Sequence, residues 1–256
     1  MKIYNIIKNP LNNVITMNLE DIIYRRQSVR KYTNNTLSEE CIESIKDIIN
    51  NSKELNPDIS WSYDIVDSSK VKTMMNWKSP HYIFMYSETS QNYLENIGFI
   101  FQQVDLYLQS HDIGSCWLGM ASPKTLNHHP QDHEFIITMA FGKSNGNISR
   151  KSDEFKRKKL EDISDKKDEK LNVARLAPSA TNSQPWYFTH DTDNSYNIYR
   201  KRQNIIKRRF LDKWNQVDIG IALAHIYVSN KNSFEFYVKD DYEKIDGHIY
   251  EGSFRI

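Results

Sequence analysis

The most informative stretch of this sequence is Ala177-Pro178-Ser179-Ala180-Thr181-Asn182-Ser183-Gln184-Pro185-Trp186. Pro178 favours the end of a helix, because a proline disfavours the helical conformation in the residue before it. The small side chains around it allow the backbone to approach a ligand closely. Asn182 and Gln184 offer both donors and acceptors, which suits the edge of a ring with alternating C=O and N–H groups. A plain polar helix–strand connection would not require so dense a set, so we expect this segment to bind a ligand.

A second candidate is the basic segment Arg25-Arg26-Gln27-Ser28-Val29-Arg30, which places three guanidinium groups and a hydroxyl within six residues. Arginine forms bidentate hydrogen bonds with phosphate oxygens, and each charge-assisted bond contributes about 1.5–3 kcal/mol. Taken alone, the segment is also compatible with a solvated basic patch on the surface. The interpretation as a phosphate site therefore depends on what the rest of the chain supplies.

Two further segments are weaker candidates. The glycines of Gly114-Ser115-Cys116-Trp117-Leu118-Gly119-Met120 would let the backbone pass near a planar ring, or they mark a core strand with a tight turn. The segment Arg150–Lys159 contains Lys156, Arg157, Lys158 and Lys159, and it is either part of a basic site or a solvated linker.

The chain also repeats itself imperfectly, and the order of the repeated segments is kept. Asn18–Ile22 is echoed by Lys159–Ile163, Trp61–Tyr63 by Trp186–Phe188, and Ile97–Leu106 by Ile219–Val228. The second half lacks a counterpart to about Ser28–Glu43, and the first half has the plain polar loop Asn50–Ser60 where the second half has Ala177–Pro185. We therefore expect one domain, 1–256, made of two half-repeats, 18–149 and 150–256, that combine two half-sites into one.

Hydrophobic periodicity predicts helices and strands in alternation. We expect helices at 19–24, from a Ser38 cap to about 49, at 97–108, at 168–176 and at 217–228. We expect strands at 61–66, 82–86, 135–141, 186–189, 196–199 and 234–238. The hairpin across 191–195 favours an α+β domain over a doubly wound sheet.

Composition excludes several classes of function. The formal net charge of +1 over 256 residues gives no global field for nucleic acid or an anionic membrane. No apolar run is long enough to span a membrane, and Met1–Ile7 lacks a signal-peptide core, so we expect a cytoplasmic protein. Two cysteines are too few for a disulfide framework.

Three local patterns resemble sites but fit poorly. His128, His129 and His133 lack matching metal ligands, and Asp191–Ser195 lacks the glycine and glutamate of a calcium loop, so we expect no metal. Arg200–Arg209 is basic but has no aromatic platform for nucleic acid, and we interpret it as a solvated helix.

Taken together, these motifs resemble the nitroreductase family of FMN enzymes, and the tandem, single-chain TM nitroreductase type most closely. The R-x-S-x-R segment, the A-P-S-x-x-N-x-Q-P-W motif, the G-S-C-W-L-G segment and the late basic cluster carry the resemblance, which covers most of the chain from about Asn18. It implies a nitroreductase-like α+β fold, with a mixed sheet flanked by helices and duplicated as a pseudo-dimer within one chain. In the family's usual homodimer both motifs lie early in one chain and in the reverse order, so here a monomer is sufficient for the site, and a homodimer stays open.

The resemblance also implies roles for individual residues. It places the FMN phosphate and ribityl chain at Arg25, Arg26, Ser28 and Arg30, assisted by Lys156 and Arg157. It places the isoalloxazine at Pro178, Ser179, Ala180, Asn182 and Gln184, with Trp117, Leu118 and Gly119 near the reactive N5 edge. No side chain is assigned as a catalytic acid or base, because the flavin carries the chemistry.

The implied activity is ping-pong hydride transfer through N5, from NAD(P)H to a small-molecule acceptor such as a nitroaromatic or a quinone. Basic groups and backbone donors near the ring would stabilise the reduced flavin. Two alternatives stay open: a non-catalytic FMN-binding protein for storage or redox sensing, and a nucleic-acid-binding module that uses Arg25–Arg30 and Arg200–Arg209.

Overall fold

The computed structural model describes residues 18–125, 132–192 and 194–256, with the backbone alone for 205–210. The helices are α1 (Leu19–Ile23), α2 (Glu39–Asn50), α3 (Tyr93–Ser110), α4 (Asn172–Arg175) and α5 (Ile205–Ser229). The strands are β1 (Trp61–Asp67), β2 (Val71–Thr73), β3 (His81–Glu88), β4 (Ile113–Leu118), β5 (Ala121–Pro123), β6 (His133–Lys143), β7 (Trp186–His190), β8 (Ser195–Lys201), β9 (Glu235–Tyr237) and β10 (His248–Arg255). Some predictions concern residues outside the described part of the chain, namely Met1–Ile7, His128, His129 and Asp193.

The two halves of the chain have the same topology. Apart from the small sheet of β2 and β5 in the first half, each half runs strand, strand, long helix, strand, strand. The orders of the two four-stranded sheets are β1-β3-β6-β4 and β7-β8-β10-β9. The strands pair antiparallel within both sheets, and parallel pairing occurs among the described residues as the single bridges Ser28–Ser115 and Ser164–Phe188. The α+β class and the duplication expected from the repeats are thus confirmed.

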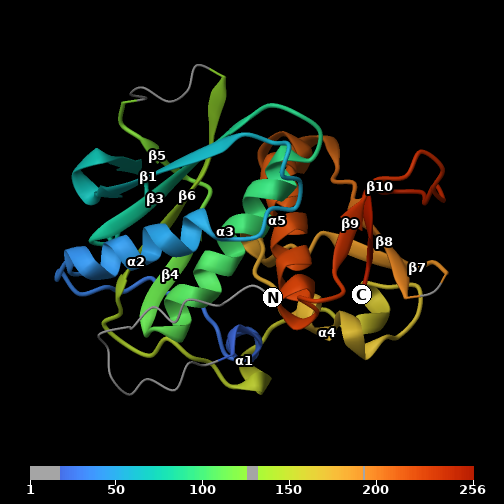
Figure 1. Cartoon of the computed structure of the whole chain (residues 1–256), viewed down its shortest axis with the longest axis horizontal. Coiled ribbons are helices and arrows are strands. Elements are labelled where there is room, and N and C mark those ends of the chain that lie inside the picture. Colours follow the sequence, from blue (N-terminus) through green and yellow to red (C-terminus); the bar gives the residue numbers. More distant parts are fainter. Residues whose placement is uncertain (1–17, 126–131, 193) are drawn as a thin grey trace, which may run out of the picture.

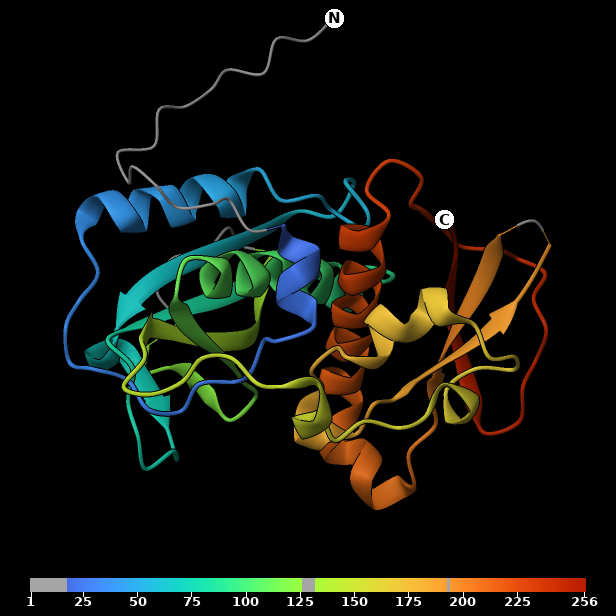
Figure 2. The same ribbon diagram turned by 90° about the horizontal axis from the view of Figure 1, so that it is seen from below.

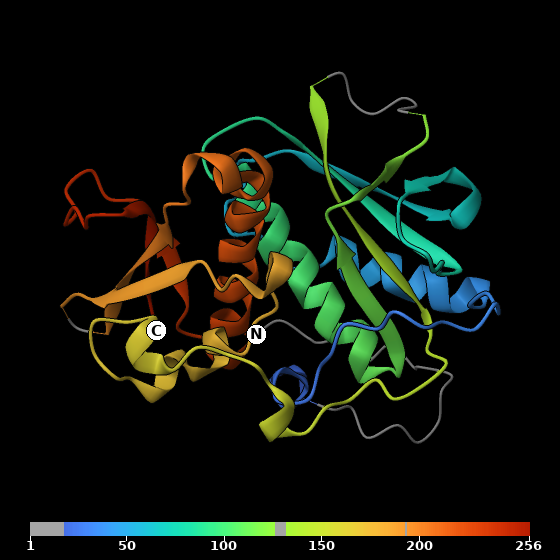
Figure 3. The ribbon, with the colours of Figure 1, turned by 180° about the vertical axis from the view of Figure 1, so that it is seen from behind.

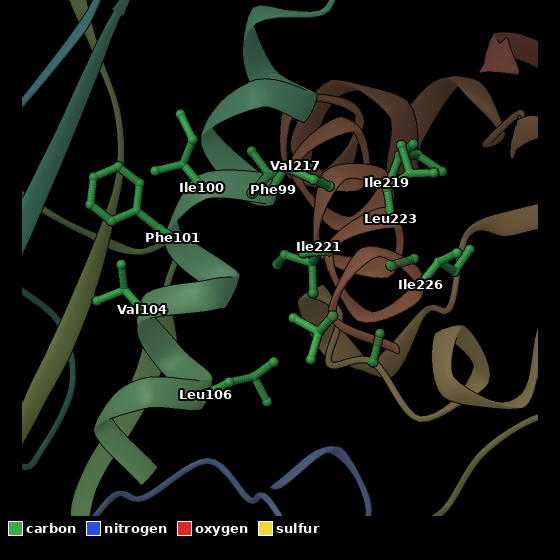
Figure 4. Close-up of a cluster of buried hydrophobic side chains, with 14 of the residues drawn as sticks. Phe99, Ile100, Phe101, Val104, Leu106, Val217, Ile219, Ile221, Leu223 and Ile226 are labelled. Atoms are coloured by element: carbon green, nitrogen blue, oxygen red, sulfur yellow. The ribbon is translucent and has the colours of Figure 1, made fainter. Parts of the chain in front are cut away.

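The two long helices, α3 and α5, lie between the two sheets (Figures 1 and 2). Their apolar side chains make one continuous core with both sheets. In Figure 4, Phe101 and Val104 point from α3 toward the first sheet, whereas Ile221 lies between the helices. A second, smaller core on the other face of the first sheet includes Tyr82, Cys116 and Leu118.

The crossing of α3 and α5 depends on one glycine in each helix. A Cβ added at Gly98 would meet the Val217 carbonyl oxygen at 2.1 Å, and one at Gly220 would meet the Glu95 carbonyl oxygen at 1.8 Å. Val217 and Glu95 each precede the glycine of their own helix by three residues, so the two contacts are related by the internal symmetry. The repeated Ile-Gly pairs in the sequence therefore mark the point where the two halves touch backbone to backbone.

Each long helix also holds the loop before its own sheet in the same way. Asn96 of α3 accepts hydrogen bonds from the backbone N–H groups of Leu55 and Asn56, at 2.9 and 3.1 Å. Asp218 of α5 accepts from the N–H of Ala180 with both carboxyl oxygens, at 3.0 and 3.1 Å. The loop Asn50–Ser60 is thus the spatial counterpart of 177–185, although their sequences differ.

The expected elements recur in the structure, but one helix begins earlier than expected, and the strands β2, β5 and β10 were not expected. Ser38 caps α2 through the N–H of Cys41, and β7 and β8 form the expected hairpin. The helix expected from 217 begins at Ile205, and β10 was not expected because its polar residues mask the alternation of a strand.

The interpretation of Arg200 as part of a solvated helix is wrong. Arg200 lies on β8, is buried, and forms ion pairs with Glu251 and Asp212. Its basic sequence neighbours gave no sign of these partners, because Glu251 comes from the last strand. Side chains 205–210 of the same basic run lie outside the described part.

None of the described helices is long and apolar enough to cross a membrane. The described side chains also include no group of three His, Cys, Asp or Glu arranged to hold a metal ion.

Candidate functional site

Two adjoining cavities lie where the two halves meet. One, of about 460 Å³, has mainly polar and basic walls, and the other, of about 190 Å³, has mainly apolar walls. Both are lined by Ser28 and Arg30 of the first half and by Pro178, Ser179 and Thr181 of the second. They therefore form one composite cleft with a basic end and an apolar end.

The basic segment reaches the cleft because it runs along the edge strand β4 of the first sheet (Figure 3). The Val29 N–H donates to the carbonyl of Ser115 at 2.9 Å, and Ser28 bridges the same residue. Arg26 bridges Ser149 on the other side, and the carbonyl of Arg25 accepts from the N–H of Arg150 at 2.8 Å. These contacts bring the late basic segment beside the early one.

The basic end of the cleft carries far more positive than negative charge. Among the described residues, its lining contains five cationic side chains and one carboxylate: Arg26, Arg30, Arg150, Lys156, Arg157 and Glu154. Burial, together with the neighbouring Arg26, Arg150 and Arg175, lowers the pKa of Arg157 to about 10. Burial likewise lowers the pKa of Arg150, with contributions from Arg26 and Arg30. The arginines repel one another, so an anion of two charges would relieve the repulsion.

The segment 177–185 forms a loop with unusual backbone geometry. Thr181, Asn182 and Gln184 all have positive φ, at 53°, 58° and 47°, although none is glycine. Such conformations cost of order 1–3 kcal/mol each and persist where surrounding contacts impose them. Here the contacts are many: besides Asp218, the Gln184 N–H donates to Ser179 Oγ at 2.9 Å.

Asn182 and Gln184 use their amide groups to bind the late basic segment. Asn182 accepts from Arg157 at 2.6 Å and donates to the Lys156 carbonyl at 2.9 Å. Gln184 is buried and accepts from the N–H of Lys158 at 2.7 Å. Asn182 lines the basic cavity, and Gln184 lies outside both linings. In this arrangement the two amides hold the cleft together rather than face its apolar end.

The apolar end is walled by β4 and by α5. Trp117 and Gly119 line it together with Trp214, Val217 and Ile221, and the half-exposed Met120 lies at its rim. A Cβ at Gly119 would meet the Trp214 ring at 2.6 Å, so this position allows the close packing of Trp214. Because side chains alternate across a strand, Leu118 points away from the cavity into the smaller core.

A buried polar network lies behind the cleft. Arg26 Nε and the Asp105 carboxylate are 2.9 Å apart, and both side chains are at most 1% exposed. Asp105 also accepts from Gln102 at 2.9 Å, and Gln102 accepts from the Trp117 indole at 3.0 Å. The network therefore fixes a residue at each end of the cleft, Arg26 and Trp117.

His225 ends this network in the neutral form. Its Nε2 lies 3.1 Å from the Gln102 amide nitrogen, which can only donate, so Nδ1 carries the proton and donates to the Val173 carbonyl at 2.9 Å. Complete burial lowers the pKa of His225 from its ordinary value of 6.5 to about 3, because burial disfavours the charged imidazolium.

We expect acid to destabilise the protein through His225. In the unfolded chain, His225 binds a proton below about pH 6.5, whereas in the folded chain it stays neutral down to about pH 3. The free energy of unfolding is therefore unaffected by this group above pH 6.5 and decreases as the pH falls from 6.5 to 3. The loss is about 1.4 kcal/mol per pH unit for one proton. Urea unfolding between pH 4 and 7 should show a shallower pH dependence in His225→Gln than in the unaltered protein, and equal slopes would contradict this role.

The structure places most of the expected site residues on the cleft. Those that line it are Arg26, Ser28, Arg30, Trp117, Gly119, Lys156, Arg157, Pro178, Ser179, Ala180 and Asn182. Arg25, Leu118 and Gln184 lie outside the linings. The roles of all of them toward a cofactor stay predictions.

The cleft is also lined by residues to which the sequence analysis assigned no individual role, among them Arg150, Trp214 and Asp218. Arg150 is the first residue of the late basic segment. Its guanidinium group is the same phosphate-binding group that the segment Arg25–Arg30 offers, and this likeness could have identified it from the sequence. Asp218 interrupts the apolar stripe of a long helix, as Gln102 and Asp105 do in α3, and buried polar residues in such a stripe indicate a specific partner.

Comparison with known proteins agrees with this geometry. The family model described as "Putative TM nitroreductase" matches residues 18–230. No curated protein shows significant similarity to the chain. Among solved structures, a protein from Thermotoga maritima described as a "putative nitroreductase" is 21% identical, with 96% of each chain covered and a TM-score of 0.63.

Shorter proteins resemble part of the chain. An "FMN-dependent Nitroreductase" from Clostridium difficile R20291 is 16% identical, with 55% of this chain and 98% of that one covered and a TM-score of 0.43. A nitroreductase family protein from Clostridium difficile 630 is 15% identical, with 57% and 96% covered and a TM-score of 0.47. The family model spans the basic segment, both long helices and the loop at 177–185, and the chain therefore belongs to the nitroreductase family.

Proposed function

We propose that this chain binds one FMN in its composite cleft and is an FMN-dependent oxidoreductase that uses NAD(P)H to reduce nitroaromatic or quinone-like acceptors. The observation that carries the proposal is the polarity of the cleft, which has five cationic side chains at one end and two tryptophans at the other. FMN has the matching polarity, with a phosphate at one end and a planar ring at the other. The membership of the chain in the nitroreductase family supports the same conclusion.

The residues present fit each part of the cofactor. Arg26, Arg30, Arg150 and Arg157 would hold the phosphate, because a bound dianion offsets their mutual repulsion. Trp117, Trp214 and Ile221 would surround the ring and exclude water from it. When bound, flavin supplies hydride transfer between a nicotinamide and an acceptor, and the protein supplies binding and orientation.

The loop of the first half that corresponds to 177–185 borders a groove without this chemistry. The loop Asn50–Ser60 borders a separate groove of about 490 Å³, whose charged lining among the described residues is Lys53, Glu54 and Lys231. Two lysines beside a carboxylate cannot give the forked contacts of four arginines. Only the composite cleft is therefore expected to bind FMN.

We expect the purified protein to be yellow, to release FMN rather than FAD, and to saturate at one FMN per chain. The reason is that the cleft has one basic end suited to a terminal phosphate, and the sequence lacks a dinucleotide-binding G-x-G-x-x-G turn. Titration of apoprotein with FMN, followed by flavin fluorescence, gives the stoichiometry. A colourless protein that does not bind micromolar FMN would disprove the proposal, and two equivalents per chain would disprove the single composite site.

The test of turnover is separate from the test of binding. Holoprotein mixed anaerobically with NADH or NADPH should lose its flavin absorbance near the oxidised maximum, and addition of a quinone or nitroaromatic should restore it. Bound FMN that neither nicotinamide reduces would instead indicate a flavin-binding protein without turnover.

A further inference from the structure

Asp218 is a buried carboxyl in the wall of the apolar cavity. It lies on α5, is 3% exposed, and accepts from the N–H of Ala180 with both oxygens, at 3.0 and 3.1 Å. It thus anchors the strained loop at 177–185, and Asp218 lines the same cavity as Trp214 and Ile221. Burying a carboxyl in an apolar wall is costly, which requires an explanation beyond loop anchoring.

The other half of the molecule shows that a carboxyl is unnecessary for the anchoring itself. Asn96 occupies the equivalent place on α3 and accepts from the N–H groups of Leu55 and Asn56 with an amide oxygen. An amide carries no charge and avoids the cost of burying one. The chain has the ionisable side chain only in the half where that side chain lines the apolar end of the composite cleft.

The surroundings of Asp218 leave its charge largely uncompensated. On the loop side it faces the N–H of Ala180 and the hydroxyl of Ser183, and these lower its pKa. Burial has the larger effect and raises the pKa well above its ordinary value. Across the cavity, Arg30 is the one other charged side chain among the described lining residues, and it is exposed to solvent. The carboxyl is therefore sensitive to any new charge in the cavity.

We propose that Asp218 takes up a proton when flavin bound in the apolar cavity is reduced. The inference rests on the proposed function. Hydride transfer from a nicotinamide adds two electrons, one proton and one negative charge to the ring. The carboxylate of Asp218 then binds one proton from solvent and becomes a carboxylic acid. The site gains two electrons and two protons in total, and its net charge is unchanged.

The physical reason is electrostatic. A negative charge that appears in the same, mainly apolar cavity raises the pKa of a carboxyl there more than it would in water. The pKa of Asp218 is therefore higher beside reduced flavin than beside oxidised flavin. Proton uptake accompanies reduction at any pH between those two values, and Asp218 acts on the ring through its charge.

The experiment is a spectroelectrochemical titration of the holoprotein over pH 5 to 9. The slope of the flavin midpoint potential against pH gives the number of protons bound per two electrons. We expect the unaltered protein to bind one proton more than Asp218→Asn over a continuous pH window. Asp218→Asn should keep the loop anchored, as Asn96 does in the other half, so its flavin content should remain close to one per chain. Parallel lines for the two proteins over the whole range would overturn the inference.

A control and a second measurement keep the test decisive. Glu154 is the one other carboxylate among the described lining residues, and Glu154→Gln should retain the slope of the unaltered protein. If Asp218→Asn binds no flavin, the reduced-minus-oxidised infrared spectrum of the unaltered holoprotein tests instead whether a carboxylate becomes protonated on reduction. A new band of a protonated carboxylic acid, shifted in Asp218→Glu, supports the inference, and its absence overturns it. Failure of the unaltered protein to bind FMN would instead refute the proposed function.

Discussion

Arg26→Ala is expected to destabilise the fold by about 3–5 kcal/mol and also to abolish tight FMN binding. Arg26 is 1% exposed and its guanidinium lies 2.9 Å from the fully buried carboxylate of Asp105. Removal of the arginine leaves a buried negative charge without a cationic partner, which is among the most costly changes in a protein interior. The same arginine lines the basic cavity, so a phosphate contact is lost as well.

Urea unfolding of the apoprotein measures the first effect without the stabilisation that bound FMN adds. The double variant Arg26→Ala/Asp105→Asn should regain much of the stability, because the buried charge is gone, but should still bind FMN weakly. An Arg26→Ala protein as stable as the unaltered one would show that the ion pair contributes nothing to the fold.

Arg30→Ala is the matched control for binding. Arg30 lines both cavities but is exposed, so its removal should change stability by about 0.5 kcal/mol or less. Loss of one charge-assisted contact should weaken FMN binding by about ten- to a hundredfold. The contrast between the two arginines separates a residue that serves the fold and the site from one that serves the site alone. Unchanged FMN affinity in Arg30→Ala would remove this residue from the site.

Gly220→Ala is expected to destabilise the protein by about 3 kcal/mol or more, at the upper end of the range for overpacked cores. The new Cβ would lie 1.8 Å from the carbonyl oxygen of Glu95, and a backbone atom of a buried helix cannot rotate away as a side chain can. The helices must separate, which opens the core that joins the two halves. Because the composite cleft is built by both halves, FMN affinity should fall together with stability.

Thermal unfolding of the apoprotein should show a melting temperature lower by about 6 °C or more, given the size of the chain. Gly98→Ala should have a similar effect, because its Cβ would lie 2.1 Å from the carbonyl oxygen of Val217. Gln216→Ala, which lies on α5 with Gly220, is the control and should change the free energy of unfolding by about 0.5 kcal/mol or less. Near-neutral values for both glycine variants would contradict the close backbone contact.

Much of the site was predictable because its signals are local. A ligand site is indicated within a few consecutive residues by the small and amide side chains of 177–186 and by the arginines of 25–30. The repeated Ile-Gly pairs likewise identified α3 and α5 as equivalent helices, and the structure places both glycines at the crossing. Periodicity of apolar residues located most strands for the same reason, since the period of a strand is read over a few residues.

The partners of these residues came only from the tertiary structure. Nothing in the sequence near Arg26 shows that it is buried against Asp105, or that Arg200 is paired with Glu251, because each pair joins segments far apart in the chain. Asn182 and Gln184 were expected to contact a ring, which stays a prediction, and only the structure shows that their amides bind the 156–158 segment.

The sequence alone determined the family resemblance, the α+β class and the existence of two unequal halves, because motif chemistry and periodicity are properties of short segments. The tertiary structure alone decided which half-sites meet, and that Arg150, Trp214 and Asp218 complete the cleft, with Asp218 at its apolar end. The physical reason is that burial and charge balance depend on neighbours in space. Those neighbours are set by how closely α3 and α5 cross at Gly98 and Gly220.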